Sequence, residues 1–164
     1  MADIRDDQAQ APKLPPKVVK YKRPDMSQVD SKAVIRLVQS DVMIGNVQII
    51  KEGGDNNLHS HAGMDGFWFV IRGQARFYGT LEEQIIADIG AGEAVFIPRN
   101  YPYWFERIGD EDLEILQIEA IDRSVRNTRT DHKPLKHSGS ASSTFGMDGK
   151  LLSTSGLTRE PGAT

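Results

Sequence analysis

The chain has 164 residues, which is enough for one domain of ordinary size and too short for several. Its 20 lysines and arginines stand against 23 acidic residues, so the net charge of -3 leaves no cationic excess for a nucleic-acid backbone. The absence of cysteine excludes disulfides, thiolate nucleophiles and cysteine-based metal sites, and leaves histidines and carboxylates as the strong metal ligands.

Composition also indicates the broad class of protein. Hydrophobic residues make up 38% and charged residues 26% of the chain, as in an average globular domain. No apolar run approaches the roughly 18 residues of a membrane span, and the polar start MADIRDDQAQ lacks the apolar core of a signal peptide. We therefore expect a soluble cytoplasmic protein with neither membrane nor nucleic acid as a partner.

Residues 1–31 are expected to form an extended N-terminal arm. They mix charges of both signs with prolines and show no sustained apolar period, which is typical of segments without a packed core. The prolines stand at positions 12, 15, 16 and 24.

Residues 32–122 have the pattern of an antiparallel β-sandwich or barrel. Short runs rich in Val, Ile, Phe, Tyr and Trp are separated by Gly, Asn, Asp and Pro at intervals of roughly 8 to 12 residues, and no helical period competes. The predicted strands span residues 33–39, 42–51, 58–61, 67–72, 74–78, 84–88, 94–97, 103–107 and 113–120. This region is therefore predicted to be a single all-β domain.

Residues 123–164 become polar again, and their serines and glycines indicate a C-terminal tail. The tail is expected to be a flexible end, or the tail and the N-terminal arm lie against the domain or against a neighbouring subunit. Because an aromatic-rich β-domain of this size has edges that a partner can cover, the predicted state is a homodimer.

Two histidines are the first candidates for chemistry. His59 and His61 stand two apart in a predicted strand, and side chains at that spacing point to the same face. Both imidazoles could then bind one metal ion. The alternative is that they are neutral, hydrogen-bonded residues of a wall.

The residues around this pair form a glycine-framed motif. Gly53 is followed after five residues by His59, and the motif ends at Gly73; downstream, Gly92 is followed after five residues by Pro98. The first stretch resembles the first cupin motif and the second resembles the second cupin motif. The resemblance implies a single cupin-like antiparallel β-barrel, or jelly roll, with extended arms, and a divalent metal at His59 and His61.

The sequence departs from the cupin pattern at two positions. The usual glutamate falls on Gly66 and the usual third histidine falls on Tyr103. Asp65 can complete the metal shell if a bulge turns it inward, or it is a turn residue, because strict alternation places it opposite Gly66. Tyr103 is the predicted catalytic residue; it lines the pocket as a neutral donor first and is a metal ligand second, since its ordinary pKa is near 10.

The function implied by the resemblance is that of a metal-dependent enzyme acting on a small organic molecule. The implied reaction types are those of an oxygenase such as a dioxygenase, an isomerase, a cyclase or a lyase, with iron, zinc, manganese or nickel as the metal. The alternative is a non-catalytic cupin that serves as a binding or assembly module, because two of the four expected ligands are replaced.

Overall fold

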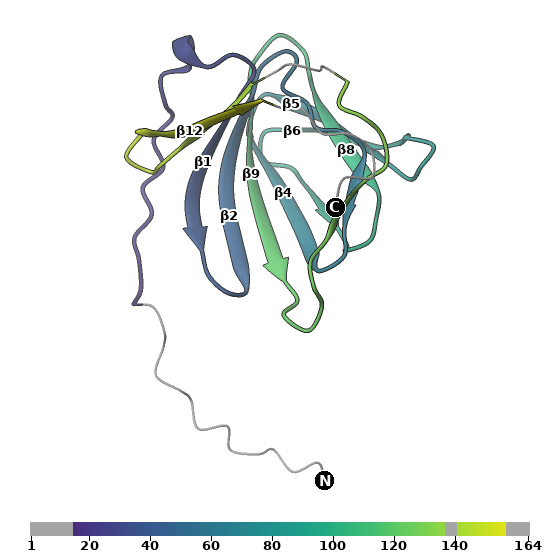
Figure 1. Cartoon of the computed structure of the whole chain (residues 1–164). Coiled ribbons are helices and arrows are strands. Elements are labelled where there is room, and N and C mark those ends of the chain that lie inside the picture. Colours follow the sequence, from purple (N-terminus) through teal and green to yellow (C-terminus); the bar gives the residue numbers. More distant parts are fainter. Residues whose placement is uncertain (1–14, 137–140, 157–164) are drawn as a thin grey trace, which may run out of the picture.

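The computed structural model describes residues 15–136 and 141–156 (Figure 1). The predicted arm and tail also include residues 1–14, 137–140 and 157–164, which lie outside the described residues. Among the described residues, the regular elements are one short 3-10 helix, η1 (Met26–Gln28), and strands joined by loops. The strands are β1 (Lys32–Gln39), β2 (Met43–Ile50), β3 (His59–His61), β4 (Met64–Arg72), β5 (Gln74–Gly79), β6 (Gln84–Gly90), β7 (Ala94–Ile97), β8 (Tyr103–Ile108), β9 (Leu113–Ile121), β10 (Arg129–Asp131), β11 (Ala141–Phe145) and β12 (Leu151–Gly156).

These strands form two sheets that lie face to face (Figure 1). The larger sheet has the order β12-β11-β1-β2-β9-β4-β7 and the smaller one the order β10-β3-β8-β5-β6. The paired strands are antiparallel, except that β1 and β11 run parallel. The prediction of an all-β jelly roll is confirmed, with two separate sheets in place of a closed barrel.

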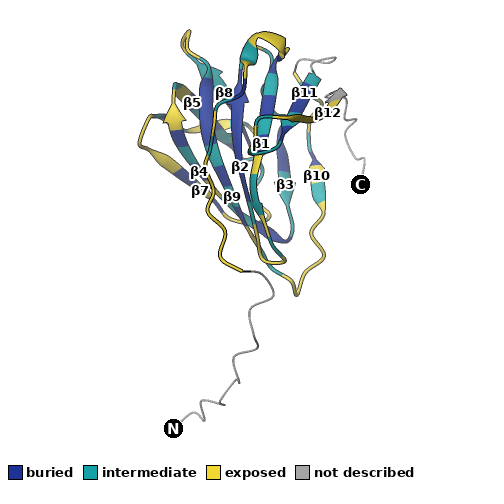
Figure 2. Cartoon of the chain, turned by 90° about the vertical axis from the view of Figure 1, so that its left-hand side faces the viewer, coloured by how far each residue is buried: buried dark blue, intermediate teal, exposed yellow. Residues whose placement is uncertain are grey.

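The main core lies between the two sheets. It is formed by every second side chain along each strand, the ones that point inward, because successive side chains of a strand point to opposite faces. Phe77 and Phe105 stack with ring centroids 4.8 Å apart, and Trp68 lies 4.9 Å from Phe105. Burying one such side chain contributes about 1.5–3 kcal/mol. The buried residues concentrate along the facing strands, and the exposed ones concentrate in the loops (Figure 2).

A second apolar cluster covers the outer face of the larger sheet. Ile50 of β2 points into the main core, whereas Ile49 points to this outer face and packs with Ile35 of β1. Tyr21, Met26 and the buried Val29 pack against the same cluster. Part of the predicted N-terminal arm therefore covers the sheet.

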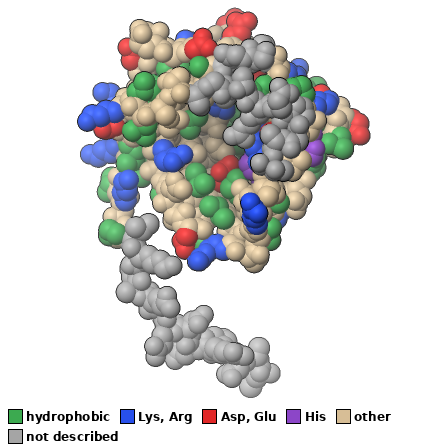
Figure 3. All heavy atoms as spheres, in the orientation of Figure 1, with side chains coloured by type: hydrophobic (Ala, Val, Ile, Leu, Met, Phe, Trp, Pro, Cys, Tyr) green, Lys and Arg blue, Asp and Glu red, His purple; other side chains and the backbone are tan. Residues whose placement is uncertain are grey.

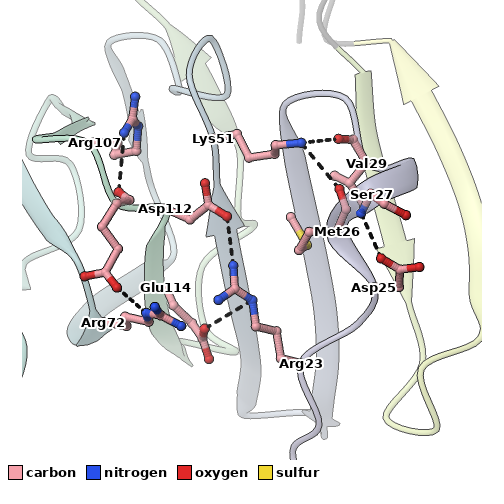
Figure 4. Close-up of polar contacts among 11 residues, drawn as sticks. Arg23, Asp25, Met26, Ser27, Val29, Lys51, Arg72, Arg107, Asp112 and Glu114 are labelled. Atoms are coloured by element: carbon pink, nitrogen blue, oxygen red, sulfur yellow. Dashed lines mark hydrogen bonds and ion pairs between the residues drawn. The ribbon is translucent and has the colours of Figure 1, made fainter.

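Polar contacts attach this N-terminal segment to the sheet (Figure 4). Arg23 Nη2 donates to Asp112 Oδ2 at 2.8 Å, at the start of β9. Lys51 Nζ donates to the carbonyl oxygen of Val29 at 2.9 Å. The segment that follows residue 20 is thus held by both charge and apolar contact. The described residues include no helix with the length and apolar character that a membrane crossing requires.

The region predicted as a C-terminal tail contributes three strands to the sheets. β10 pairs with β3 at the edge of the smaller sheet, and β11 pairs with β1 in the larger sheet. β11 and β12 are rich in serine and threonine, so their composition resembles that of a loop. Their backbone pairing and the apolar side chain of Phe145 hold them to the sheet.

Candidate active site

β3 presents both histidines to a cavity of about 220 Å³ between the sheets. The His59 and His61 rings meet edge to face, with centroids 5.1 Å apart. Ser60 lies between them in sequence and its Oγ is 3.0 Å from His132 Nε2, away from the cavity lining. Acidic, basic and histidine side chains lie close together on the face that Figure 3 shows. The period of two along β3 thus brings both imidazoles to one place.

The tautomer of His59 is fixed by a backbone carbonyl. Its side chain is only 2% exposed, and its Nδ1 donates to the carbonyl oxygen of Asn57 at 2.7 Å. Because a carbonyl only accepts, the proton resides on Nδ1 and the lone pair remains on Nε2. Burial, followed by the charge of Arg129, lowers the pKa of His59 well below its ordinary value. His59 is therefore neutral at pH 7, the state in which imidazole binds metals.

Residues of β10 hold Asn57 in position. Asn57 Nδ2 donates to Asp131 Oδ1 at 2.8 Å and to the carbonyl oxygen of Lys133 at 2.8 Å. Arg129 Nη2 donates to Asn57 Oδ1 at 2.5 Å, and Arg129 Nε donates to Asp131 Oδ1 at 2.8 Å. The C-terminal region therefore supports the orientation of His59, and sequence analysis missed this because Asn57 and β10 are more than 70 residues apart.

Tyr103 lies beside His59 on the neighbouring strand. The two residues are paired across β3 and β8, and their ring centroids are 4.6 Å apart. Tyr103 is 4% exposed, and this burial, together with the charge of Glu119, raises its pKa above the ordinary value. Its phenol is therefore protonated at neutral pH and acts as a hydrogen-bond donor or acceptor.

Glu119 is a site residue that sequence analysis missed. It lies on β9 directly opposite Gly66 of β4, the position at which the cupin resemblance places a glutamate. Its side chain lines the cavity together with His61 and Tyr103. The signal available in the sequence was the inward-facing series of β9, which changes from apolar to polar at Gln117.

Glu119 is 8% exposed and is tied to the larger sheet through amides. Gln117 Nε2 donates to Glu119 Oε1 at 2.5 Å, and Gln48 Nε2 donates to Gln117 Oε1 at 2.5 Å. Burial raises the pKa of Glu119, and the bond from Gln117 opposes this shift. A carboxyl group in this environment holds its proton to a higher pH than an exposed one.

The structure does not bring Asp65 to the two histidines. Its carboxylate accepts from the backbone nitrogen of Arg99 at 2.8 Å and from Arg99 Nη2 at 3.0 Å. Arg99 also pairs with Asp122. The bonds from Arg99 lower the pKa of Asp65, which stays ionised. Strand alternation explains this orientation, because it places Asp65 and Gly66 on opposite faces of β4.

The donors that face the cavity are two imidazoles and the Glu119 carboxylate. Imidazole and carboxylate are the donor types of divalent metal sites with open positions. Within the described part of the chain, no three His, Asp or Glu side chains are grouped as a finished metal centre. The donor chemistry fits a metal held by His59 and His61, with other positions left to water or a ligand.

The aromatic side chains of β4, β7 and β8 lie in three environments. Trp68 and Phe105 belong to the main core, and Tyr103 lines the cavity. Phe67 and Phe96 are 43% and 61% exposed, and they are paired on neighbouring strands β4 and β7. Their exposure leaves an aromatic pair on the outer face of the larger sheet.

The two facing sheets and the paired histidines define a protein of the jelly-roll, or double-stranded β-helix, class. A family model described as "Cupin domain" matches residues 46–119, from β2 to β9. This match confirms, for the part of the chain from β2 to β9, the resemblance to a small cupin domain that the glycine-framed motifs indicate. A comparison with curated proteins found no significant match.

Solved structures show the same fold. An RmlC-like cupin family protein with a double-stranded β-helix fold from Methanocaldococcus jannaschii is 19% identical, with a TM-score of 0.53, covering 66% of this chain and 93% of its own. A protein with a double-stranded β-helix domain from Klebsiella pneumoniae is 16% identical, with a TM-score of 0.54 and coverages of 68% and 84%. A Thermus thermophilus protein is 22% identical, with a TM-score of 0.50 and coverages of 56% and 84%.

Proposed function

We propose that this cupin is an enzyme that binds a divalent metal at His59 and His61 and acts on a small organic molecule in the cavity between its sheets. The observation that carries the proposal is the convergence of these histidines with Tyr103 and Glu119 on one cavity of about 220 Å³. A concave site that combines apolar walls with a few titratable groups of shifted pKa is typical of an active site.

The two histidines supply the metal ligands in this proposal. The Nδ1 bond to Asn57 leaves Nε2 of His59 as the atom that carries a lone pair. A bound divalent ion would supply Lewis acidity, which polarises a carbonyl group or lowers the pKa of bound water. Two imidazoles leave positions open, which suits the oxygenase, isomerase, cyclase and lyase types that the resemblance implies.

Tyr103 and Glu119 are the residues that handle protons. The protonated phenol of Tyr103 donates a hydrogen bond to a substrate oxygen beside His59. Because the pKa of Glu119 is raised, it lies closer to neutral pH than the pKa of an exposed carboxyl group. Glu119 can therefore give or take a proton at the cavity wall. Met64 and Trp68 form the apolar part of the wall and limit the access of water.

The metal content of the untagged protein tests this proposal. The wild type should retain about one divalent ion per chain in elemental analysis, and His59→Ala and His61→Ala should each abolish it. His132→Ala is the matched control, because this imidazole contacts Ser60 of the same strand and does not line the cavity. A double His59→Ala, His61→Ala variant with unchanged metal content would contradict the proposal. A wild type that takes up no metal would favour the non-catalytic binding module.

A further inference from the structure

Two cationic side chains line the cavity next to the proposed metal ligands. Lys32 begins β1 in the larger sheet, and Arg129 begins β10 in the smaller sheet. Both line the same cavity as His59, His61 and Tyr103. The two cations therefore come from opposite sheets and face one space.

Among the described residues that line this cavity, two side chains are cationic and one is acidic. That acidic side chain is Glu119, whose Oε1 accepts a hydrogen bond from Gln117. Asp131 binds Arg129 along β10 and is absent from the cavity lining.

A cavity with this charge distribution favours an anionic ligand. Charges interact more strongly in a partly buried space than in water, so a ligand with a negative group gains attraction that its neutral analogue lacks. Arginine and lysine are the side chains that proteins use most for carboxylates and phosphates. The amides of Gln48 and Asn56 add hydrogen bonds for polar substituents on the same wall.

We propose that the ligand of this cavity is a small organic anion, whose carboxylate or phosphate group is held by Lys32 and Arg129 while the rest of the molecule faces His59, His61 and Tyr103. The inference rests on the proposed function in that it takes this cavity as the substrate site. The binding of the anionic group itself requires no metal, so the two proposals are tested separately.

Fluorine NMR titration with 4-fluorobenzoate and 4-fluorobenzamide tests the inference, because the two probes have the same shape and differ in charge. We expect the benzoate to bind at least tenfold more tightly to the wild type. Lys32→Met should reduce this preference at least fivefold, and Lys32→Arg should restore most of it. Lys150→Met is the matched control, since it removes one positive charge from a strongly exposed site and should leave the preference unchanged. Inorganic phosphate as a competitor distinguishes a phosphate site, in which it displaces the benzoate, from a carboxylate site.

Each titration is repeated after the protein is stripped of metal with EDTA. A preference for benzoate that survives stripping and is lost in Lys32→Met supports the inference, even if the metal analysis refutes the proposed metal site. The inference is overturned if the two probes bind equally or if neither binds. It is also overturned if the preference for benzoate disappears on stripping and is unchanged in Lys32→Met. Circular dichroism spectra that match the wild type exclude misfolding of the variants.

Discussion

The chemical state of His59 depends on a close neighbour in sequence, Asn57, which distant residues hold in place. The carbonyl of Asn57 fixes its tautomer, and Asp131 holds the side chain of Asn57. The pair of histidines could be predicted because both lie on one strand, where the period of two places them together. Glu119 could not, because its proximity depends on how β9 pairs with β4, and no local pattern encodes that register. The orientation of Asp65 follows from alternation alone.

We predict that Asp131→Ala weakens both the fold and the metal site. The substitution leaves the amide of Asn57 and the guanidinium of Arg129 without the acceptor they share, which costs about 1–3 kcal/mol. Loss of a group that orients a ligand lowers metal affinity roughly 10–100-fold. Urea unfolding and metal titration measure the two effects. Asp148→Ala, at a strongly exposed carboxylate, is the control and should change neither; wild-type values for Asp131→Ala would refute the role of this residue.

We predict that Glu119→Gln stabilises the protein at neutral pH and has little effect at pH 4. Burial raises the pKa of Glu119 above its ordinary 4.5, so the native state favours the protonated form. The stability from this preference is fully present below the unfolded pKa and is lost as the pH rises through the folded pKa. Glutamine keeps the acceptor for Gln117 and does not ionise.

Melting temperatures of the wild type and of Glu119→Gln, measured from pH 4 to pH 8, test whether the substitution stabilises the protein at neutral pH. The difference between variant and wild type should grow with pH and then level off above the folded pKa. A difference that stays constant across the range would show that ionisation of Glu119 carries no cost.

At the scale of elements, the turn between β4 and β5 depends on one glycine. Gly73 has a φ of +77°, and an added Cβ would lie 2.7 Å from the carbonyl oxygen of Asp112. Gly92 has a φ of +88° with no atom within 4 Å of such a Cβ. Gly92→Ala therefore reports the cost of the left-handed backbone alone, which is about 1–2 kcal/mol. We predict that Gly73→Ala destabilises the protein by more than this in urea unfolding, and equal losses would refute the close approach.

The strands of the central domain were predictable, and those near the C-terminus were not. Each of the predicted strands from residue 33 to residue 120 corresponds to an observed strand, because buried apolar runs alternate with turn residues there. β10 has 3 residues, too few for a period to be visible. β11 and β12 consist largely of serine, threonine and glycine, and they lack the alternation of apolar and polar residues by which a strand is predicted. Backbone pairing with strands distant in sequence decides their structure, and a local pattern does not record it.

For the whole molecule, we predict a homodimer. The exposed pair Phe67 and Phe96 lies on the outer face of β4 and β7, and β7 is the edge strand of the larger sheet. A second copy would cover both the apolar surface and the open edge. Light scattering at micromolar concentration should give twice the mass of the chain, and Phe96→Glu should shift the protein toward the monomer.

Leu81→Glu is the control for this experiment, because Leu81 is 56% exposed, close to the 61% of Phe96, but lies in the turn between β5 and β6. It should leave the mass unchanged. A wild type that is monomeric under these conditions would contradict the predicted dimer.

The central claim of this account is that His59 and His61 hold one divalent metal in the cavity between the sheets. Anomalous diffraction from crystals grown with cobalt(II) tests it most directly. The account predicts one strong peak about 2.0–2.1 Å from a ring nitrogen of each histidine, as in zinc–imidazole bonds. A metal-saturated crystal with no peak beside His59 and His61, or with its peak at another site, would contradict the claim.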